Sequence, residues 1–445
     1  MSESQKIAVI GAGIVGASCA LYLQQSGFKV TLFDRDEPGS GATYGNACTF
    51  ATYGSIPVNR PDLIWRFPRL MFGDDRPLSI SWPYMPRMLP WLWQFLLHCR
   101  RYQVDRTING LGALLRRAES ASMKLFQASD VQDLLARDGT IYLYPSSTSF
   151  ASDADNRRRR LAQGTRIQEL SAGELHELEP NLAPNFPHAV LYPDGFTILE
   201  PKKLTGRMVE HLRQRGGIFI RGEVSSIERT SAGGVGLKIN GNPQGFTQAV
   251  LAGGAWSMKL AGSHCETLPL ETERGYHVLF SESGELLKRP VGFSEAGFYM
   301  TPMHHGLRAA GTVELGGLNA VANPERLAYI EKYVQRALPD VGPVSDTWLG
   351  FRPTLPDALP VIGRSTINPA LIFAFGHHHL GLTLGGITGQ LVSEIASRTT
   401  PSTPMWTGTP HTRWRMILAL DTRRAAARTR ASPKDAATGS RPRTA

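Results

Sequence analysis

Three glycines near the N-terminus constrain the fold more than any other feature of the sequence. Gly11, Gly13 and Gly16 have G-x-G-x-x-G spacing and follow the apolar run 7–10, which is typical of a buried parallel strand. In such a strand–turn–helix unit the glycines allow a tight turn, a close approach to a pyrophosphate and close helix packing. The motif predicts a helix over residues 14–25 whose N-terminal N–H groups face phosphates.

An acidic residue stands at the distance that this interpretation requires. Gly27 is predicted to cap the helix, and residues 29–33 are predicted to form a second strand that ends at Asp34. A carboxylate there can accept both hydroxyls of an adenosine ribose. The alternative is a glycine-rich turn that binds nothing. The predicted dinucleotide site comprises Gly11, Gly13, Ile14, Val15, Gly16, Asp34 and Arg35.

Two further glycine-rich segments are suited to a long cofactor. The loop at 39–45 is flexible and rich in hydrogen-bond donors, so it wraps a cofactor or forms an ordinary surface loop. The predicted strand 246–251 runs into Ala252-Gly-Gly-Ala-Trp-Ser257, a second strand–glycine–helix junction. With the predicted strand 224–228, these segments add Gly41, Ala42, Thr43, Asn46, Ala47, Val224, Gly253, Gly254 and Trp256 to the predicted cofactor-binding residues.

The positive charge is concentrated at the C-terminus. Residues 413–445 hold nine Lys and Arg against two Asp, and thus contribute +7 of the formal net charge of +10. This segment has few large apolar residues after Leu420 and is predicted to be a basic disordered tail, although residues 414–420 could form a short helix. Charge alone gives only sequence-blind, salt-sensitive affinity for nucleic acid, and no aromatic residue beyond Trp414 interleaves the arginines. No nucleic-acid partner is therefore expected.

Cysteine usage and hydropathy favour a cytoplasmic protein. The four cysteines show no metal-ligand or C-x-x-C spacing, and no apolar run approaches the roughly twenty residues of a membrane span. No signal peptide is expected. Residues 82–127 are predicted to be helical, and the apolar stretch 91–97 is followed by Arg100 and Arg101. This stretch indicates a packed core helix, with peripheral contact at the inner membrane as the alternative.

Further elements are predicted along the chain. Residues 274–280, 297–303 and 307–313 are predicted antiparallel strands, and the basic run 157–160 is predicted to be a solvated surface. A helix is predicted over 324–338. Residues 371–375 are a predicted strand that leads into a final helix ending at about residue 397.

Five stretches together resemble the FAD-dependent D-amino-acid oxidase/dehydrogenase superfamily, which includes glycine oxidase and sarcosine oxidase. They are Ile10-Gly-Ala-Gly-Ile-Val-Gly16, Gly41-Ala-Thr-Tyr-Gly-Asn-Ala47, Ala252-Gly-Gly-Ala-Trp-Ser257, Gly350-Phe-Arg-Pro-Thr-Leu-Pro-Asp-Ala-Leu-Pro-Val-Ile-Gly363 and Phe375-Gly-His-His-His-Leu-Gly-Leu-Thr383. The sequence is most similar to the D-amino-acid dehydrogenase branch and its D-hydroxyproline dehydrogenase-like members. It departs from the pattern at His378, where glycine is expected, at Gly385-Gly386, which replaces Ala-Pro, and in the basic tail.

The resemblance implies an α/β fold with non-covalent FAD. An FAD-binding Rossmann-like domain is expected from residues 1–80, 190–265 and 345–412. An α+β substrate domain with an antiparallel sheet is expected from 81–189 and 266–344, followed by the tail 413–445. The position of Cys48 in the early glycine loop argues against a covalent flavin link.

The resemblance also implies the reaction. It is the oxidative deamination of a D-amino acid or a cyclic secondary amine, such as D-hydroxyproline or D-proline, by hydride transfer from Cα to flavin N5. Electrons would then reach a quinone-linked acceptor. The alternatives are a glycine- or sarcosine-type oxidase using O₂, a flavin enzyme acting on an RNA-borne amine, and a non-catalytic flavoprotein subunit.

Substrate contacts are expected from two segments. The resemblance assigns the substrate carboxylate to Arg352 in the G-x-R-P stretch, where a guanidinium binds both oxygens. The alternative for Arg352 is an ordinary surface ion pair. Tyr276 and His277 lie on a strand that resembles the one lining the family's substrate pocket. Since side chains alternate along a strand, only one of the two should face the flavin, and Tyr276 is favoured. Arg274 shares the face of Tyr276 and is a rival carboxylate ligand.

The C-terminal histidine loop is expected to serve the flavin. Backbone N–H groups and a helix N-terminus would stabilise the negative charge that develops at the N1–C2=O edge on reduction. His379 either assists there or only packs, and no metal site is expected from three successive histidines. The cofactor-binding residues assigned to this loop are Gly376, His377, Leu380, Gly381 and Thr383.

Overall fold

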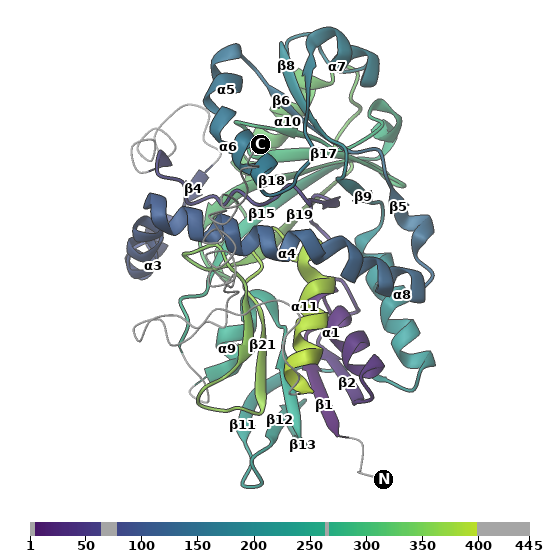
Figure 1. The fold of residues 1–445 in the computed structure, drawn as a ribbon, viewed down its shortest axis with the longest axis vertical. Helices are drawn as coiled ribbons and strands as arrows, with labels where there is room; N and C mark the ends of the chain where they lie inside the picture. Colours follow the sequence, from purple (N-terminus) through teal and green to yellow (C-terminus); the bar gives the residue numbers. More distant parts are fainter. Residues whose placement is uncertain (1–4, 64–77, 263–266, 398–445) are drawn as a thin grey trace, which may run out of the picture.

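A six-stranded sheet forms the half of the molecule that carries the glycine motif (Figure 1). The structure is a computed structural model, and it describes residues 5–63, 78–262 and 267–397. The strands in spatial order are β10 (Ile218–Arg221), β2 (Lys29–Asp34), β1 (Lys6–Ile10), β14 (Gln248–Leu251), β21 (Leu371–Phe375) and β20 (Val361–Arg364). The first five are parallel, and β20 is antiparallel to β21.

Both faces of this sheet are covered, which explains the continuous apolar run in β1. Ile7 and Val9 pack in the core that includes the helices, whereas Ala8 and Ile10 pack in the core on the opposite face. The helices on the first face are α1 (Ile14–Gln25), α8 (Pro201–Gln214), α11 (Gly381–Ala396) and α4 (Arg101–Ala128). The other face packs against a three-stranded sheet of β11 (Val224–Arg229), β12 (Val235–Ile239) and β13 (Asn242–Phe246).

A larger and mainly antiparallel sheet occupies the other half of the molecule (Figure 1). Its order is β19 (Asp346–Thr354), β15 (Glu271–Phe280), β18 (Gly306–Leu315), β17 (Phe298–Met303), β16 (Val291–Phe293), β6 (Thr140–Tyr144), β8 (His188–Tyr192) and β7 (Gln168–Ser171), and β4 (Leu78–Ile80) pairs with β18. Helix α10 (Pro324–Ala337) packs Ile330 and Val334 against one face of this sheet, where Tyr276 and Val278 lie.

Shorter elements complete the described chain. They are the small sheet of β3 (Thr49–Phe50), β9 (Phe196–Ile198) and β5 (Leu135–Ala136), the helices α3 (Met85–His98), α5 (Ser147–Ser152), α6 (Ala154–Ala162), α7 (Ala172–Leu178) and α9 (Ser257–Ala261), and the 3-10 turns Trp82–Tyr84, Gln132–Leu134, Gly254–Trp256 and Ser281–Leu286. In Figure 1, α4 crosses the molecule between the two large sheets.

This architecture confirms the predicted α/β fold class, and most predicted elements are present. The predicted helix over 82–127 is divided into α3 and α4 at Cys99 and Arg100. Trp91 and Phe95 are buried, as predicted for a packed helix, but Leu89 and Trp93 of α3 remain 55% and 65% exposed. The tail 413–445 and Cys265 lie outside the described residues, and the division into domains stays a prediction.

The prediction that residues 157–160 form a solvated surface is wrong for two of the four arginines. Arg157 is buried and donates to the carboxylate of Glu169, and Arg160 donates through Nε to the carbonyl of Tyr53 at 3.2 Å. Helix α6 turns both residues inward, and only Arg158 is strongly exposed. The four consecutive arginines therefore lie on both the inner and the outer face of α6.

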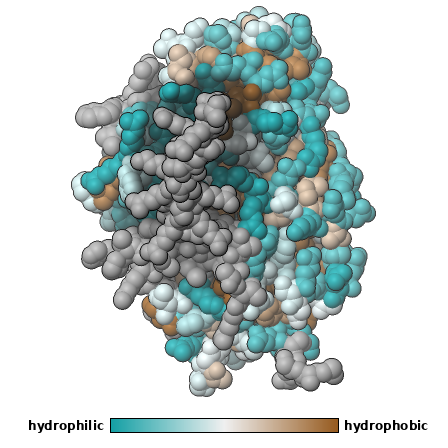
Figure 2. All heavy atoms as spheres, in the orientation of Figure 1, coloured by the Kyte–Doolittle hydropathy of each residue, from teal (hydrophilic) through white to brown (hydrophobic). Residues whose placement is uncertain are grey.

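Among the described helices, none combines the length and the hydropathy that crossing a bilayer requires. The coloured residues on the face shown in Figure 2 are mostly hydrophilic, with separate hydrophobic spots.

Candidate active site

A large cavity lies between the two halves of the molecule. Its volume is about 910 Å³, near the upper end of the range for ligand pockets. One end is lined by the glycine motif and Asp34, and the other reaches the large sheet at Arg352 and Tyr299. Its walls therefore combine the predicted cofactor-binding residues with the predicted substrate contact.

Most residues predicted from the sequence meet at this cavity. The lining includes Gly11, Gly13, Ile14, Val15, Asp34, Arg35, Gly41, Ala42, Thr43, Asn46, Ala47, Val224, Gly253, Gly254, Trp256, Arg352, His377, His379, Leu380 and Gly381. Gly16, Gly376 and Thr383 stand behind the lining and support it. A Cβ on Gly16 would lie 1.8 Å from the carbonyl oxygen of Gly11, and Thr383 Oγ1 accepts the N–H of Ala51 at 2.9 Å.

The glycine-lined end has the features of a dinucleotide site. Gly11 has a φ of +107°, and a Cβ there would lie 2.4 Å from the carbonyl oxygen of Ala252. Asp34 accepts the N–H of Ala12 at 2.6 Å, and burial raises the pKa of its carboxyl group. Thr43 Oγ1 accepts the N–H of Ile14 at 3.1 Å, so the second glycine loop is tied to the start of α1. These residues fit the pyrophosphate and ribose of FAD.

Arg352 is half-buried and held in place by backbone carbonyls. Its Nη1 donates to the carbonyl of Thr312 at 2.7 Å and its Nη2 to that of Gly311 at 3.3 Å. Gly275 on β15 leaves the room for this guanidinium, because a Cβ there would lie 2.3 Å from Nη2. Burial lowers the pKa of Arg352, and the nearby Glu273 opposes that shift. The side chain is a fixed positive charge in the cavity wall.

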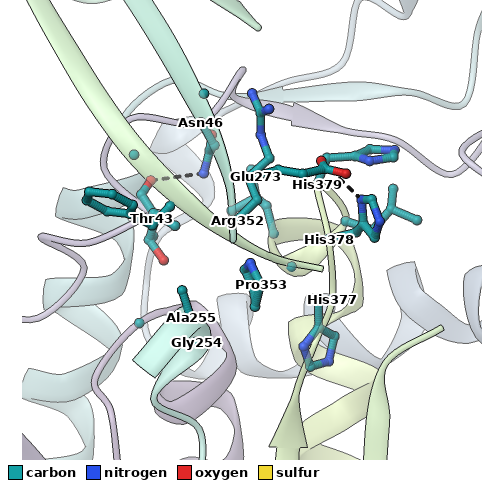
Figure 3. Close-up of a pocket in the computed structure, with 18 of the residues that line it drawn as sticks. Thr43, Asn46, Gly254, Ala255, Glu273, Arg352, Pro353, His377, His378 and His379 are labelled. Carbon is teal, nitrogen blue, oxygen red and sulfur yellow. Dashed lines mark hydrogen bonds and ion pairs between the residues drawn. The ribbon is translucent and has the colours of Figure 1, made fainter. Parts of the chain in front are cut away.

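Glu273 is a site residue that the sequence reasoning missed. It pairs with Arg352 in the register of β15 and β19, and both residues line the cavity. Figure 3 shows its carboxylate directed toward the ring of His378, where Oε2 lies 3.6 Å from Nδ1. Burial raises the pKa of this carboxyl group, while Arg352 and His379 lower it. Because side chains alternate along a strand, the prediction that Tyr276 faces the flavin implied that Glu273 points to the other face of the sheet.

The prediction that Tyr276 faces the flavin is wrong, and so is the placement of Arg274 as a rival substrate ligand. Both side chains point away from the cavity. Arg274 Nη1 lies 3.4 Å from the carboxylate of Glu314, and Tyr276 also bonds that carboxylate and accepts the N–H of Asn323 at 2.9 Å. Side chains alternate along β15 as predicted, but the face with Arg274 and Tyr276 points away from the cavity and the face with Glu273 points into it.

The three histidines of the C-terminal loop have different surroundings (Figure 3). His377 Nε2 lies 2.9 Å from Thr388 Oγ1, and burial lowers its pKa to about 3. His378 is buried beside Glu273 with a φ of +56°, and burial followed by the charge of Arg352 lowers its pKa to about 3. His379 is open to the cavity. Among the described residues, no three His, Cys, Asp or Glu side chains gather as a metal-ligand group.

A group of aromatic side chains, also missed from the sequence, closes the far end of the cavity. Tyr53 Oη donates to Tyr299 Oη at 3.2 Å, and Tyr142 Oη also bonds Tyr299. Arg160 approaches the same region through the carbonyl of Tyr53. These residues come from separate segments, so only the folded chain brings them together.

The comparisons with known proteins decide the family. Residues 6–395 match the profile of the DAO family of FAD-dependent oxidoreductases. The chain belongs to this family. It is 33% identical to a D-amino-acid oxidase of Bradyrhizobium diazoefficiens over 413 residues, which cover 91% of this chain and 98% of that protein. It is 28% identical to a D-amino acid dehydrogenase of Vibrio vulnificus over 408 residues, which cover 88% and 95%.

A solved structure supports the fold of this oxidoreductase independently. Glycine oxidase from Geobacillus kaustophilus superposes with a TM-score of 0.68 at 20% identity, and the match covers 93% of this chain and 99% of that one. The family is FAD-dependent, and the residues at the glycine-lined end of the cavity fit this cofactor. When bound, FAD supplies the two-electron acceptor, and the protein supplies binding and orientation.

Proposed function

We propose that this oxidoreductase oxidises a D-amino acid or a cyclic secondary amine, such as D-proline or D-hydroxyproline, at the carbon bearing the nitrogen. The observation that carries the proposal is Arg352, whose half-buried guanidinium lies in the wall of the cavity that also holds the proposed FAD-binding residues. Such a group pairs with a carboxylate through two parallel hydrogen bonds. Relatives named D-amino-acid oxidase and D-amino acid dehydrogenase support this substrate class.

Arg352 is suited to orient its ligand because it is rigid. The carbonyls of Gly311 and Thr312 fix the plane of the guanidinium before any substrate arrives. An orientation that is fixed before the substrate binds contributes to the reaction rate as well as to the affinity. Arg274, by contrast, is engaged by Glu314 and by the carbonyls of Ala320 and Val321.

We propose that FAD is bound without a covalent link. Cys48, the cysteine of the early glycine loop, is fully buried and is not part of the cavity lining. Its pKa is raised by burial, which disfavours the thiolate. Arg308 contacts its sulfur at 3.4 Å, which gives the thiol a packing role.

For the electron acceptor we propose a quinone-linked partner of a cytoplasmic enzyme, with O₂ as the alternative. Peripheral membrane contact is proposed for α3, which exposes Leu89 and Trp93; Trp82, in the turn before this helix, is exposed as well. Basic residues at 100 and 101 follow this helix and suit an anionic surface.

Anaerobic reduction tests the substrate class. The yellow holoenzyme is mixed with single D- and L-amino acids, including the prolines and hydroxyprolines, and bleaching of the flavin is followed. Bleaching by a D-amino acid or cyclic imino acid is expected. Reoxidation of the bleached enzyme by O₂ and by a soluble quinone then identifies the acceptor. Bleaching by an amine that lacks a carboxylate, and by no amino acid, would overturn the proposal.

A further inference from the structure

Two opposite charges face the cavity from neighbouring strands. Glu273 on β15 and Arg352 on β19 are register partners, so their side chains emerge on the same face of the sheet. Both line the cavity. An amino-acid zwitterion carries its carboxylate and its ammonium on one carbon, and two fixed charges at adjacent positions of a sheet match that spacing.

The two groups influence each other without forming a direct ion pair. Each shifts the pKa of the other, yet no nitrogen of Arg352 lies within 4.0 Å of the Glu273 carboxylate among the described contacts. The guanidinium instead donates to the carbonyls of Gly311 and Thr312. The pair therefore keeps its charges available to a ligand.

Glu273 lacks a cationic partner in direct contact. The basic side chain in contact with its carboxylate is that of His378, whose Nδ1 lies 3.6 Å from Glu273 Oε2. The imidazole of His378 is neutral near pH 7 because burial lowers its pKa to about 3. The remaining charged or titratable neighbours are Arg352 and His379, which faces the cavity. Burying a carboxylate without a paired cation raises the free energy of the folded protein, and a cationic ligand bound beside it would offset this penalty.

We propose that Glu273 binds the ammonium group of the substrate and accepts the proton that the amine loses before it is oxidised. This inference rests on the proposed function. The nitrogen–hydrogen bond breaks, its electron pair stays on nitrogen as the free amine, and the proton forms an oxygen–hydrogen bond on the carboxylate. No oxidant takes part in this step. Arg352 and Glu273 together then select ligands that carry both a carboxylate and a basic nitrogen.

The pair predicts opposite responses to two kinds of ligand. A zwitterion gains a contact from each charge, whereas a simple carboxylate gains Arg352 but is repelled by Glu273. Removing the negative charge at position 273 should therefore weaken the binding of the zwitterion and strengthen the binding of the simple carboxylate. A carboxylate that only neutralised Arg352 would affect both ligands in the same direction.

The test compares the holoenzyme with its Glu273→Gln variant. D-Proline is the zwitterion, and pyrrole-2-carboxylate, which lacks a basic nitrogen, is the simple carboxylate. The affinity for pyrrole-2-carboxylate is measured by calorimetry. The affinity for D-proline is taken from the concentration dependence of flavin bleaching in anaerobic rapid-mixing experiments, or from calorimetry if D-proline does not reduce the flavin. We expect the variant to bind D-proline about tenfold or more weakly, the effect of a lost charged hydrogen bond, and to bind pyrrole-2-carboxylate several-fold more tightly.

The pH dependence gives a second readout. In the variant the amine has to arrive unprotonated, so kcat/KM with the best amino acid should rise about tenfold per pH unit up to the pKa of the free amine. The wild type should reach its plateau at lower pH. Glu271→Gln, the same change two residues earlier on β15 and outside the cavity lining, is the matched control and should leave both readouts unchanged.

Specific outcomes would overturn the inference. Tighter binding of both ligands would reduce Glu273 to a counter-ion of Arg352, and unchanged binding of both would remove it from the site. If Glu273→Gln fails to retain FAD, Glu273→Asp is measured; it should keep the low-pH plateau with weaker D-proline binding, and a lost plateau would contradict the proposal. If no amino acid reduces the wild-type flavin, the proposed function fails, whereas opposite ligand responses would still support the ammonium contact.

Discussion

The backbone N–H of His378 donates a hydrogen bond to the carbonyl oxygen of Pro353 at 3.0 Å. This bond joins the loop before α11 to the residue that follows Arg352 on β19. His378 has a φ of +56°, a conformation that glycine adopts without strain and histidine does not. The departure from the glycine expected at this position is therefore a change of residue and not of backbone. The imidazole that it adds lies against Glu273.

Replacing Arg352 with lysine tests the carboxylate contact. Lysine keeps the charge but cannot bond the carbonyls of Gly311 and Thr312 and a carboxylate as a planar fork does. We expect kcat/KM for the best amino acid to fall by the equivalent of about 2–4 kcal/mol, with normal flavin content. Steady-state kinetics and the flavin spectrum measure both. If the variant keeps the wild-type kcat/KM, another residue binds the substrate carboxylate. If the variant loses FAD, Arg352 is part of the cofactor site.

The cofactor half of the site was largely predictable because its signals are local. The helix predicted over residues 14–25 has the observed bounds of α1, and Asp34 ends β2 at the cavity. Turn glycines, a short apolar strand and a spaced acid act within some thirty residues of each other. Such patterns depend on backbone geometry that one segment fixes by itself.

The substrate half was predicted less well because its face is set by tertiary packing. Alternation along β15 separates Glu273 from Arg274, but it does not say which of the two sides meets the cavity. Helix α10 decides this by packing against the side of Tyr276. The cluster of Tyr53, Tyr142 and Tyr299 joins segments that are far apart in the sequence, so no local pattern could have grouped them.

The two adjacent glycines of α11 should respond differently to alanine. A Cβ on Gly386 would lie 2.4 Å from Ser122 Oγ and 2.6 Å from its backbone N, whereas a Cβ on Gly385 would meet nothing closer than 3.3 Å. We expect Gly386→Ala to destabilise the protein by about 1–3 kcal/mol because α4 has to move away. Gly385→Ala is the matched control, and differential scanning calorimetry should show a clear loss of thermal midpoint only for Gly386→Ala. Equal midpoints would show that α4 adapts freely.

Acid precipitation should release the flavin. The reason is the burial of Cys48 behind the cavity lining, which leaves the proposed FAD without a covalent link. Yellow colour is expected in the supernatant, with the spectrum and mass of FAD. Cys48→Ser should release the same amount, and a yellow pellet from the wild type would refute the non-covalent binding.

Removal of residues 413–445 should leave turnover and flavin content nearly unchanged. The motivation is composition, since this segment carries nine Lys and Arg but few large apolar side chains after Leu420 that could join a core. Truncated and full-length enzymes are compared for kcat/KM and FAD per protein. A large loss of turnover on a small amino acid would give the segment a role in the site.

Stability should fall as the pH drops below about 6.5, in part because of His377. Burial lowers the folded-state pKa of His377 to about 3, so below pH 6.5 the unfolded chain binds a proton that the folded protein does not. The unfolded state is thereby favoured by up to about 1.4 kcal/mol per pH unit per histidine, and this contribution to stability is complete only above the unfolded-state pKa. His377→Gln keeps a group that can bond Thr388 but removes the titration.

The variant should therefore lose less thermal midpoint than the wild type between pH 7.5 and 5, a range set by these pKa values. Comparing the two proteins isolates His377 from Asp34 and Glu273, whose pKa values are raised by burial and whose contributions have the opposite sign. His176→Gln on the exposed surface of α7 controls for the loss of a histidine as such. Parallel curves for wild type and His377→Gln would show that the imidazole is already charged, or reached by water, in the folded protein.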